Sequence, residues 1–246
     1  MTTLLAIENV SKHFGSIKAV DGVSLSIAQQ KIHGIVGPNG AGKTTLFNIV
    51  SGFLSATAGE ITLDGRKLTT APAHERVHRG MARTFQTPQL FPEMTVLENV
   101  MVGAYGRVLR LDRTGKSLTA TEGQAHEILK FVALSDSASL LASELPYPAQ
   151  RRLEIARALM TDPRLLLLDE PAAGMNAAET AQLMRLILEI RAQGRTVVVI
   201  EHNMRLIMGV SERVTVINFG QVIADGTPAE VRADPKVISA YLGGQA

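Results

Sequence analysis

Residues 37–45 read Gly37-Pro38-Asn39-Gly40-Ala41-Gly42-Lys43-Thr44-Thr45, and they separate the apolar run 32–36 from a segment typical of a helix, from Thr44 towards Phe53. The spacing of two glycines followed by Lys-Thr is that of a phosphate-binding P-loop. Glycines let the backbone approach phosphate oxygens closely, and the N-terminus of the following helix adds partial positive charge. The sequence therefore predicts that residues 37–45 bind a nucleoside triphosphate.

Two side chains of this loop and two later acids carry the predicted chemistry. Lys43 supplies a cation for the β- and γ-phosphates, and the Thr44 hydroxyl can bind Mg²⁺. The apolar run 165–168 ends in Asp169 and Glu170, as expected of a buried parallel strand that delivers acids at its carboxyl end. We expect Asp169 to bind the Mg²⁺ shell and Glu170 to polarise a water in line with the γ-phosphate.

Composition narrows the class of protein. The chain has 246 residues with 46% hydrophobic content, enough for a full core in one α/β domain or in one domain with a subdomain. It has no cysteine, which excludes disulfides, thiolate metal sites and cysteine catalysis. The net charge of +2, without a block of basic residues, gives no indication of a surface that binds nucleic acid. No run approaches the roughly 18 apolar residues of a membrane helix, so we expect a cytosolic chain unless a partner holds it at a membrane.

Strand patterns dominate both ends of the chain. Residues 5–11 and the alternating Val23, Leu25 and Ile27 predict an edge sheet, whereas the nearly continuous apolar run 32–36 predicts a central strand. The other expected elements are strands at 60–63, 81–85, 196–200, 214–217 and 221–224, helices at 72–79 and 176–193, and terminal helices opening at Thr227 and Asp234.

The middle of the chain predicts helices instead. Between 87 and 160 we expect helices over 95–101, 122–134 and 149–160, with 111–120 as a polar, exposed connection. Charges on the last of these helices are interpreted as a solvated face; they are Arg151, Arg152, Glu154 and Arg157.

Two single residues have open interpretations. Phe14 follows the first strand, and spacing alone favours a core contact for it. His202 follows Glu201 at the end of the strand 196–200, and the residues alone leave it evenly divided between a structural and a functional role.

These motifs occur together with several longer segments, which are Ala82–Gln86, Leu90–Asn99, Arg151–Leu159, Asp169–Gly174 and Glu201–Asn203. In this order they resemble the ATP-binding cassette of ABC transporters over essentially the whole chain, and within it they are similar to the ATPase subunits of branched-chain amino acid importers. The resemblance implies an α/β fold of the P-loop NTPase (RecA-like) type. Residues 1–86 and 161–246 would form the core with an antiparallel β-subdomain, and 87–160 an inserted α-helical signature subdomain.

The resemblance also implies roles for single residues. Phe14 would stack on the adenine of ATP, Gln86 would reach Mg²⁺ and the attacking water, and His202 would contact the γ-phosphate. With Lys43 and Glu170, Gln86 and His202 would form the catalytic set. Residues 172–176 would touch an opposite subunit.

Partners follow from the same resemblance. Such subunits work as pairs of cassettes, identical or paralogous, that clamp two ATP molecules beneath two transmembrane permease subunits, with a periplasmic or extracellular binding protein that supplies solute. The segment Leu90-Phe91-Pro92 would lie where a permease docks. The chain would then be a peripheral protein at the cytoplasmic face of the inner (plasma) membrane.

One segment departs from the family pattern. The signature pentapeptide Leu-Ser-Gly-Gly-Gln falls at Leu145-Pro146-Tyr147-Pro148-Ala149. By resemblance, Tyr147 and Pro148 would face the nucleotide of the partner cassette, where a backbone N–H is expected, and proline has none. We hypothesise that the chain binds ATP normally at residues 37–45 but that both its dimerisation around ATP and its hydrolysis of ATP are poor. The alternative is that Pro148 is tolerated in the first helical turn and neighbouring groups cover the phosphate.

Other functions remain open at this stage. They are the ATPase of another ABC system, such as lipopolysaccharide export, a cassette protein without a transport role that acts on ribosomes or DNA, and a regulatory subunit with weak hydrolysis because of Pro148.

Overall fold

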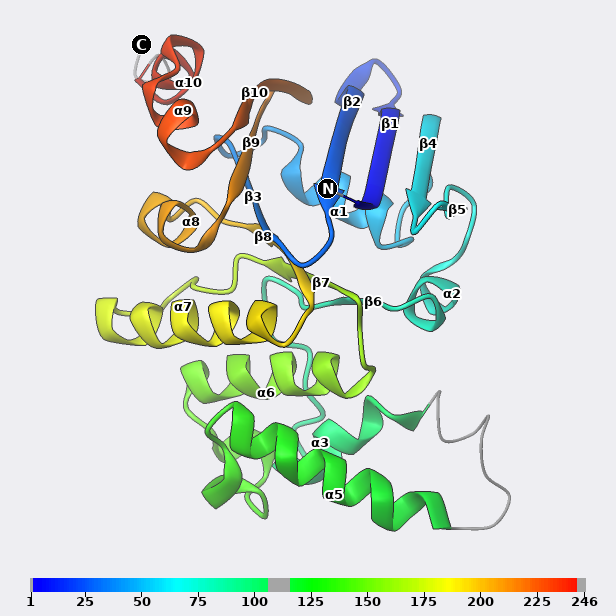
Figure 1. Cartoon of the computed structure of the whole chain (residues 1–246), viewed down its shortest axis with the longest axis vertical. Helices are drawn as coiled ribbons and strands as arrows, with labels where there is room; N and C mark the ends of the chain where they lie inside the picture. Colours follow the sequence, from blue (N-terminus) through cyan, green and yellow to red (C-terminus); the bar gives the residue numbers. More distant parts are fainter. Residues whose placement is uncertain (1, 106–115, 243–246) are drawn as a thin grey trace.

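The computed structural model describes residues 2–105 and 116–242, which form two β-sheets and several helices (Figure 1). The smaller sheet is antiparallel, with strand order β2-β1-β4-β5. Its strands are β1 (Thr3–Phe14), β2 (Ile17–Ala28), β4 (Ala58–Leu63) and β5 (Arg66–Lys67). The larger sheet has the order β10-β9-β3-β8-β7-β6 and is parallel except for β10. Its strands are β3 (Ile32–Val36), β6 (Met81–Arg83), β7 (Leu165–Asp169), β8 (Thr196–Ile200), β9 (Arg213–Asn218) and β10 (Gln221–Gly226).

The three central strands are the continuous apolar runs of the sequence. Every residue of β3, β7 and β8 is buried, because helices or the second sheet cover both faces of the larger sheet. On one face α1 (Lys43–Val50) packs between the two sheets, since its apolar residues share a cluster with β1, β2, β4 and the central strands. On the other face the core includes α7 (Ala177–Ala192) and α8 (Met204–Val210).

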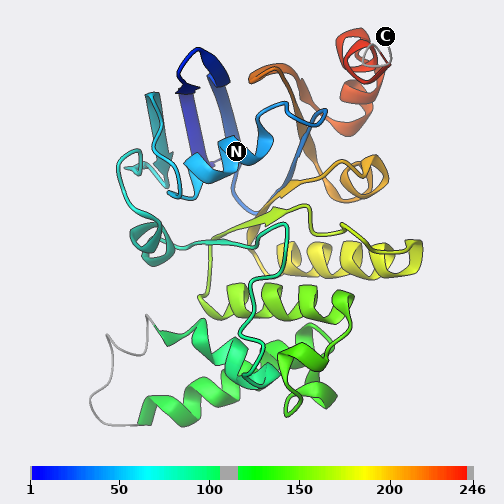
Figure 2. The ribbon, with the colours of Figure 1, turned by 180° about the vertical axis from the view of Figure 1, so that it is seen from behind.

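A group of helices lies at the end of the molecule away from the smaller sheet in both views (Figure 1 and Figure 2). It contains α3 (Val96–Val102), α5 (Lys116–Phe131) and α6 (Tyr147–Met160). The remaining helical elements are α2 (Ala73–His78), η1 (Ser135–Ser137), η2 (Ala142–Glu144), α9 (Pro228–Ala233) and α10 (Pro235–Leu242). Among residues 2–105 and 116–242, no helix combines the length and the hydropathy needed to cross a bilayer.

Helix starts follow the capping signals of the sequence. Reciprocal capping boxes open α3, α7 and α9, in each case between a Thr or Asn side chain and a Glu three residues later. These satisfy N–H groups that a helix start leaves unpaired, so each helix begins where its cap predicts.

Several expected boundaries are wrong. Residues 116–120 belong to α5 instead of a polar connection, because that helix begins at Lys116; the rest of the connection, 111–115, lies outside the described residues. Strand β6 ends at Arg83, two residues before the predicted end, and α6 begins at Tyr147 instead of Ala149.

The interpretation of the α6 charges as a solvated face is also wrong. Arg151 and Glu154 have side-chain exposures of 0% and 2% and form an ion pair. The physical reason is that α6 is covered on nearly all sides, so these charges pair with each other and with a neighbouring loop instead of water.

The buried His33 of β3 makes folding stability depend on pH. Its Nε2 lies 2.7 Å from Thr215 Oγ1, and desolvation lowers the pKa of His33 from 6.5 to about 4. The folded chain therefore keeps this ring neutral, whereas the unfolded chain binds a proton below about pH 6.5. Because the unfolded state binds more protons in this window, stability falls as the pH drops from about 6.5 towards 4.

We expect the wild-type chain to lose about 2 kcal/mol more unfolding free energy than His33→Gln between pH 7 and pH 5. The comparison cancels the shared carboxylates, and guanidinium unfolding curves at both pH values measure it. Parallel losses in the two proteins would contradict a neutral buried His33.

Candidate functional site

The candidate site lies at one edge of the larger sheet. Strands β3, β6, β7 and β8 are parallel neighbours or next neighbours, so their carboxyl ends share this edge. Residues 37–45 follow β3, and residues 84–86 follow β6. Asp169 ends β7 and Glu170 follows it, and residues 201–202 follow β8. Such an edge is where parallel α/β sheets bind ligands.

The loop 37–45 is shaped by close approach of the backbone. A Cβ on Gly37 would lie 2.0 Å from the carbonyl oxygen of Ile217, so only glycine fits there. Gly42 caps α1 at a φ of 100°, a left-handed conformation that favours glycine. The structure therefore brings this loop directly onto the N-terminus of α1, as the sequence predicts.

The loop that precedes Lys43 encloses its side chain. Its Nζ donates to the carbonyl oxygens of Gly37 at 2.7 Å and Pro38 at 2.9 Å, and the residue is 6% exposed. Burial lowers the pKa of Lys43 below its ordinary value, and the negative charges of Glu170 and Asp169 offset this effect only in part. The ammonium is therefore held among backbone carbonyls, close enough to both acids to interact with them.

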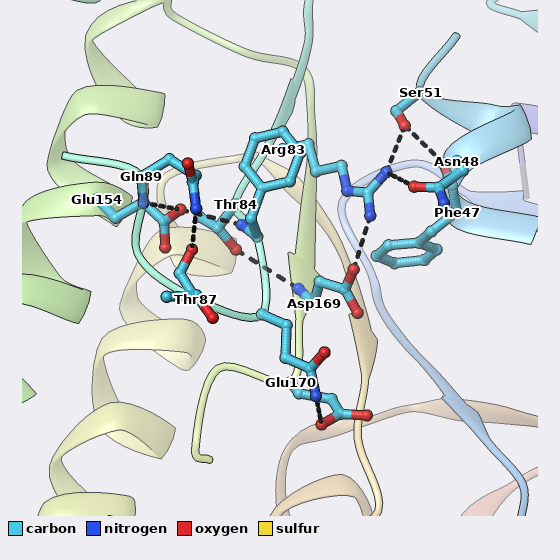
Figure 3. Close-up of polar contacts among 12 residues, drawn as sticks. Phe47, Asn48, Ser51, Arg83, Thr84, Thr87, Gln89, Glu154, Asp169 and Glu170 are labelled. Carbon is cyan, nitrogen blue, oxygen red and sulfur yellow. Dashed lines mark hydrogen bonds and ion pairs between the residues drawn. The ribbon is translucent and has the colours of Figure 1, made fainter. Parts of the chain in front are cut away.

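Asp169 is held by Arg83, which the sequence analysis did not identify. Arg83 Nη2 donates to Asp169 Oδ2 at 2.7 Å, and its Nη1 donates to Asn48 Oδ1 and Ser51 Oγ, each at 2.7 Å (Figure 3). Burial raises the pKa of Asp169, and the Arg83 guanidinium opposes that rise. The rings around the guanidinium are those of Phe47, Phe53 and Phe85. Arg83 thus ties β6 and β7 to α1.

Three predicted residues from three strand ends meet at Glu170. Gln86 Nε2 donates to Glu170 Oε2 at 2.8 Å, and His202 Nδ1 lies 3.7 Å from the same oxygen. The Glu170 side chain is 15% exposed and that of His202 is 59% exposed. Glu170 adopts a φ of 44°, which turns the chain sharply after β7. A carboxylate with an amide and an imidazole around it can orient a water for attack.

Glu201 fixes the loops that carry these groups, and its role was missed from the sequence. The side chain is 1% exposed. Its Oε1 accepts from Ala172 N at 2.8 Å, and its Oε2 accepts from His202 N and Asn203 N, each at 3.1 Å. Its signal was an acid that directly follows the apolar run 197–200, as Asp169 follows the run 165–168.

Two further predicted contacts lie apart from this cluster. Phe14 ends β1 with 49% exposure, so its core interpretation is wrong, and the Lys12 ammonium lies 5.2 Å from its ring centroid. Tyr147 and Pro148 are the first two residues of α6. Tyr147 is 37% exposed, and a Cβ on Gly174 would lie 3.6 Å from its ring.

The donor set suits Mg²⁺. A hydroxyl at Thr44, a carboxylate at Asp169 and an amide oxygen at Gln86 are hard oxygen ligands, and Mg²⁺ takes few protein ligands beside phosphate and water. Within the described ranges there is no group of three or more His, Cys, Asp and Glu that would hold a metal alone.

Comparison with known proteins identifies relatives for almost the whole chain. A family model described as ABC transporter matches residues 20–173, and one described as branched-chain amino acid ATP-binding cassette transporter matches residues 221–246. The high-affinity branched-chain amino acid transport ATP-binding protein LivG of Salmonella typhimurium is 43% identical, over 98% of both chains.

Solved structures of ATP-binding cassettes are similar to this chain over nearly its whole length. The ADP conformation of MJ1267, an ATP-binding cassette of an ABC transporter, is 36% identical, with a TM-score of 0.89 over 99% of this chain and 100% of that one. The dimeric structure of MJ0796, a bacterial ABC transporter cassette, is 28% identical, with a TM-score of 0.81 over 92% of this chain and 99% of that one. The predicted fold class is thereby confirmed.

Proposed function

This chain belongs to the ABC transporter family, and from that membership we propose that it binds and hydrolyses ATP to drive a multi-subunit membrane importer of branched-chain or related amino acids. The observation that carries the proposal is the full-length likeness to LivG, together with the match at 221–246 to the branched-chain amino acid cassette model. The site geometry supports the hydrolytic part, because a lysine-containing phosphate loop and a positioned carboxylate share one sheet edge.

The roles of the site residues are part of this proposal. The N–H groups of residues 37–45 would hold the phosphates, with Lys43 as the cation. Thr44, Asp169 and Gln86 would hold Mg²⁺, which neutralises charge on the phosphates when bound. Glu170 would orient the attacking water, and His202 would contact the γ-phosphate. Phe14, half exposed as a flat ring, would stack on adenine.

We propose that two such chains enclose the nucleotides, and dimeric relatives support this. Residues 172–176 would then face the partner chain, as would Tyr147 and Pro148. We further propose that 1–86 and 161–246 form the core and 87–160 a helical subdomain, since all strands of the larger sheet fall in the first two ranges and α3, α5 and α6 in the third.

A membrane partner would dock beside the proposed helical subdomain. Phe91 is 45% exposed and Pro92 is exposed as well, whereas Leu90 packs partly into the core, so Phe91 is the accessible large apolar side chain of the predicted docking segment. Phe85, which precedes Gln86, lines a cavity of about 210 Å³ together with Phe53 and Val77. Phe53 is 59% exposed and Val77 is 42% exposed. An apolar surface of this kind suits a short amphipathic helix of a permease. The chain would then be peripheral, at the cytoplasmic membrane face.

Replacing Glu170 by Gln tests the hydrolytic role. We expect ATP binding to persist, because the phosphates contact residues 37–45, and turnover to fall at least about a hundredfold, because the water loses its base. Nucleotide binding and phosphate release measure the two effects. Glu189→Gln, at an exposed position of α7, is the control and should keep full turnover. Undiminished turnover in Glu170→Gln would remove that residue from the mechanism.

Replacing Phe91 by Asp tests the transport role. We expect the chain to co-purify with permease subunits from solubilised membranes and the variant to lose them, while its own nucleotide binding stays intact. Leu188→Asp, at a position 43% exposed on α7, is the matched control. Identification of the captured subunits by mass spectrometry separates an amino acid importer from an export system. Co-purification with ribosomes or DNA in place of membranes would favour a cassette without a transport role.

Replacing Pro148 by Gly tests the signature hypothesis. Pro148 occupies the first turn of α6, where its missing N–H costs the helix nothing, but a preorganised donor to developing charge typically contributes about 10²-fold to 10³-fold in rate. We expect Pro148→Gly to raise turnover at saturating ATP without changing ATP affinity of the single chain. Equal turnover would mean that neighbouring groups cover the phosphate.

A further inference from the structure

Three charged side chains along one side of α6 bind the segment 85–91 that follows β6. Arg151, Glu154 and Arg157 are spaced three residues apart, so they form a stripe on the helix. Arg157 donates to the carbonyl oxygen of Gln89. Arg151 and Glu154 are fully buried and pair at 3.0 Å.

The two buried side chains hold the backbone on both sides of Gln86. Arg151 donates from Nη1 to the carbonyl oxygen of Phe85 and from Nη2 to that of Gln86. Glu154 Oε1 accepts from Phe85 N at 3.0 Å and from Gln89 N at 3.5 Å (Figure 3). The guanidinium presents its donors in a fixed planar fork that reaches two carbonyls and the Tyr147 hydroxyl together, whereas a lysine ammonium is a single point of donation on a flexible stem.

The same guanidinium joins Gln86 to the start of α6. Arg151 Nη2 also donates to the Tyr147 hydroxyl at 2.9 Å, and the guanidinium lies 5.6 Å from the centroid of that ring. On the other side, Gln86 Nε2 donates to Glu170 at 2.8 Å. A continuous set of contacts therefore runs from Tyr147 through Arg151 and Gln86 to Glu170.

Stability alone is a weak reason for this arrangement. Well-packed apolar residues can replace a buried ion pair at little cost or with a gain, because desolvation offsets most of the attraction. An apolar pair, however, would leave the carbonyls and N–H groups of 85–89 without partners and the loop free to shift.

We propose that Arg151, oriented by Glu154, is a positioning residue that sets Gln86 against Glu170 and makes this contact depend on how Tyr147 is engaged. The inference rests on the proposed function, since Tyr147 would face the nucleotide of the partner chain. In a pair of chains, the contacts would link one nucleotide site to the catalytic carboxylate of the other.

The test uses Arg151→Lys in the full chain, alone and combined with Gln86→Ala. Lysine keeps the charge opposite Glu154 but lacks the planar fork with which Arg151 contacts both carbonyls and the Tyr147 hydroxyl. We expect the amides of 85–89 to exchange hydrogen about tenfold faster or more, while exchange in 37–45 stays unchanged. We expect kcat to fall about tenfold to a hundredfold with ATP affinity within about twofold, because misplacement affects orientation instead of binding.

The double variant separates positioning from a general structural role. If Arg151 acts through Gln86, Arg151→Lys should lower kcat no further once Gln86→Ala is present. Arg152→Lys, the neighbouring and half-exposed position, is the control and should change neither exchange nor kcat. Tyr147→Phe is a milder second variant at a partly exposed site, expected to lower kcat severalfold with the same dependence on Gln86, and Tyr105→Phe is its control.

The outcomes separate this inference from the proposed function. Absence of ATP hydrolysis by the unmodified chain would overturn both. Normal hydrolysis with additive losses in the double variant, or with unchanged exchange over 85–89 in Arg151→Lys, would overturn the positioning role alone and leave the ATPase assignment standing.

Discussion

The parallel order of β6, β7, β8 and β3 is the constraint on which the site depends. Hydrogen-bonded register places Asp169 beside Ile200 and Leu167 beside Arg83, so the residues that follow these strands must leave from one edge. The loops after β3, β7 and β8 start from strands that are buried along their whole length, so a slip in register would draw the polar residues that follow them into the apolar core. Glu170, Glu201 and His202 are the first or second residues after their strands, so the ends of β7 and β8 largely fix their positions.

Buried charges restrict that remaining freedom. Glu201 binds three backbone N–H groups from two loops, Arg83 binds Asp169 and α1, and the Arg151–Glu154 pair binds the backbone around Gln86. Each charge is costly to bury, and removing one partner would leave the other uncompensated. Hydrogen bonds from charged groups are also directional, so they fix the loops more narrowly than apolar packing would. The arrangement favours a defined loop geometry over maximal stability.

Local sequence patterns were sufficient to predict those parts of the site whose geometry depends on residues close together in the chain. The glycines and Lys43 of residues 37–45 and the acids after 165–168 could be predicted, because a loop or strand end specifies its own geometry. The burial of Arg151 and Glu154 could not, because it depends on the segment 85–91, which is some 65 residues away in sequence. One clue was available: α6 has apolar residues on almost every side, which leaves little of the helix for water. Arg83 was missed for the same reason, since its partners come from α1 and β7.

The prolines at the start of α6 connect these buried charges to the departure from the family signature. Pro146 caps the helix with a φ of −64°, and the Pro148 ring fixes the backbone two residues later, so Tyr147 has few conformations between them. Restricting the chain in this way removes unfolded conformations and favours the one in which the Tyr147 hydroxyl meets Arg151 one turn further on. A glycine at 148 would supply a backbone donor and would leave the backbone beside Tyr147 less restricted. In the proposed pair of chains, Pro148 would thus lack a donor towards the partner's nucleotide while it restricts the backbone beside Tyr147.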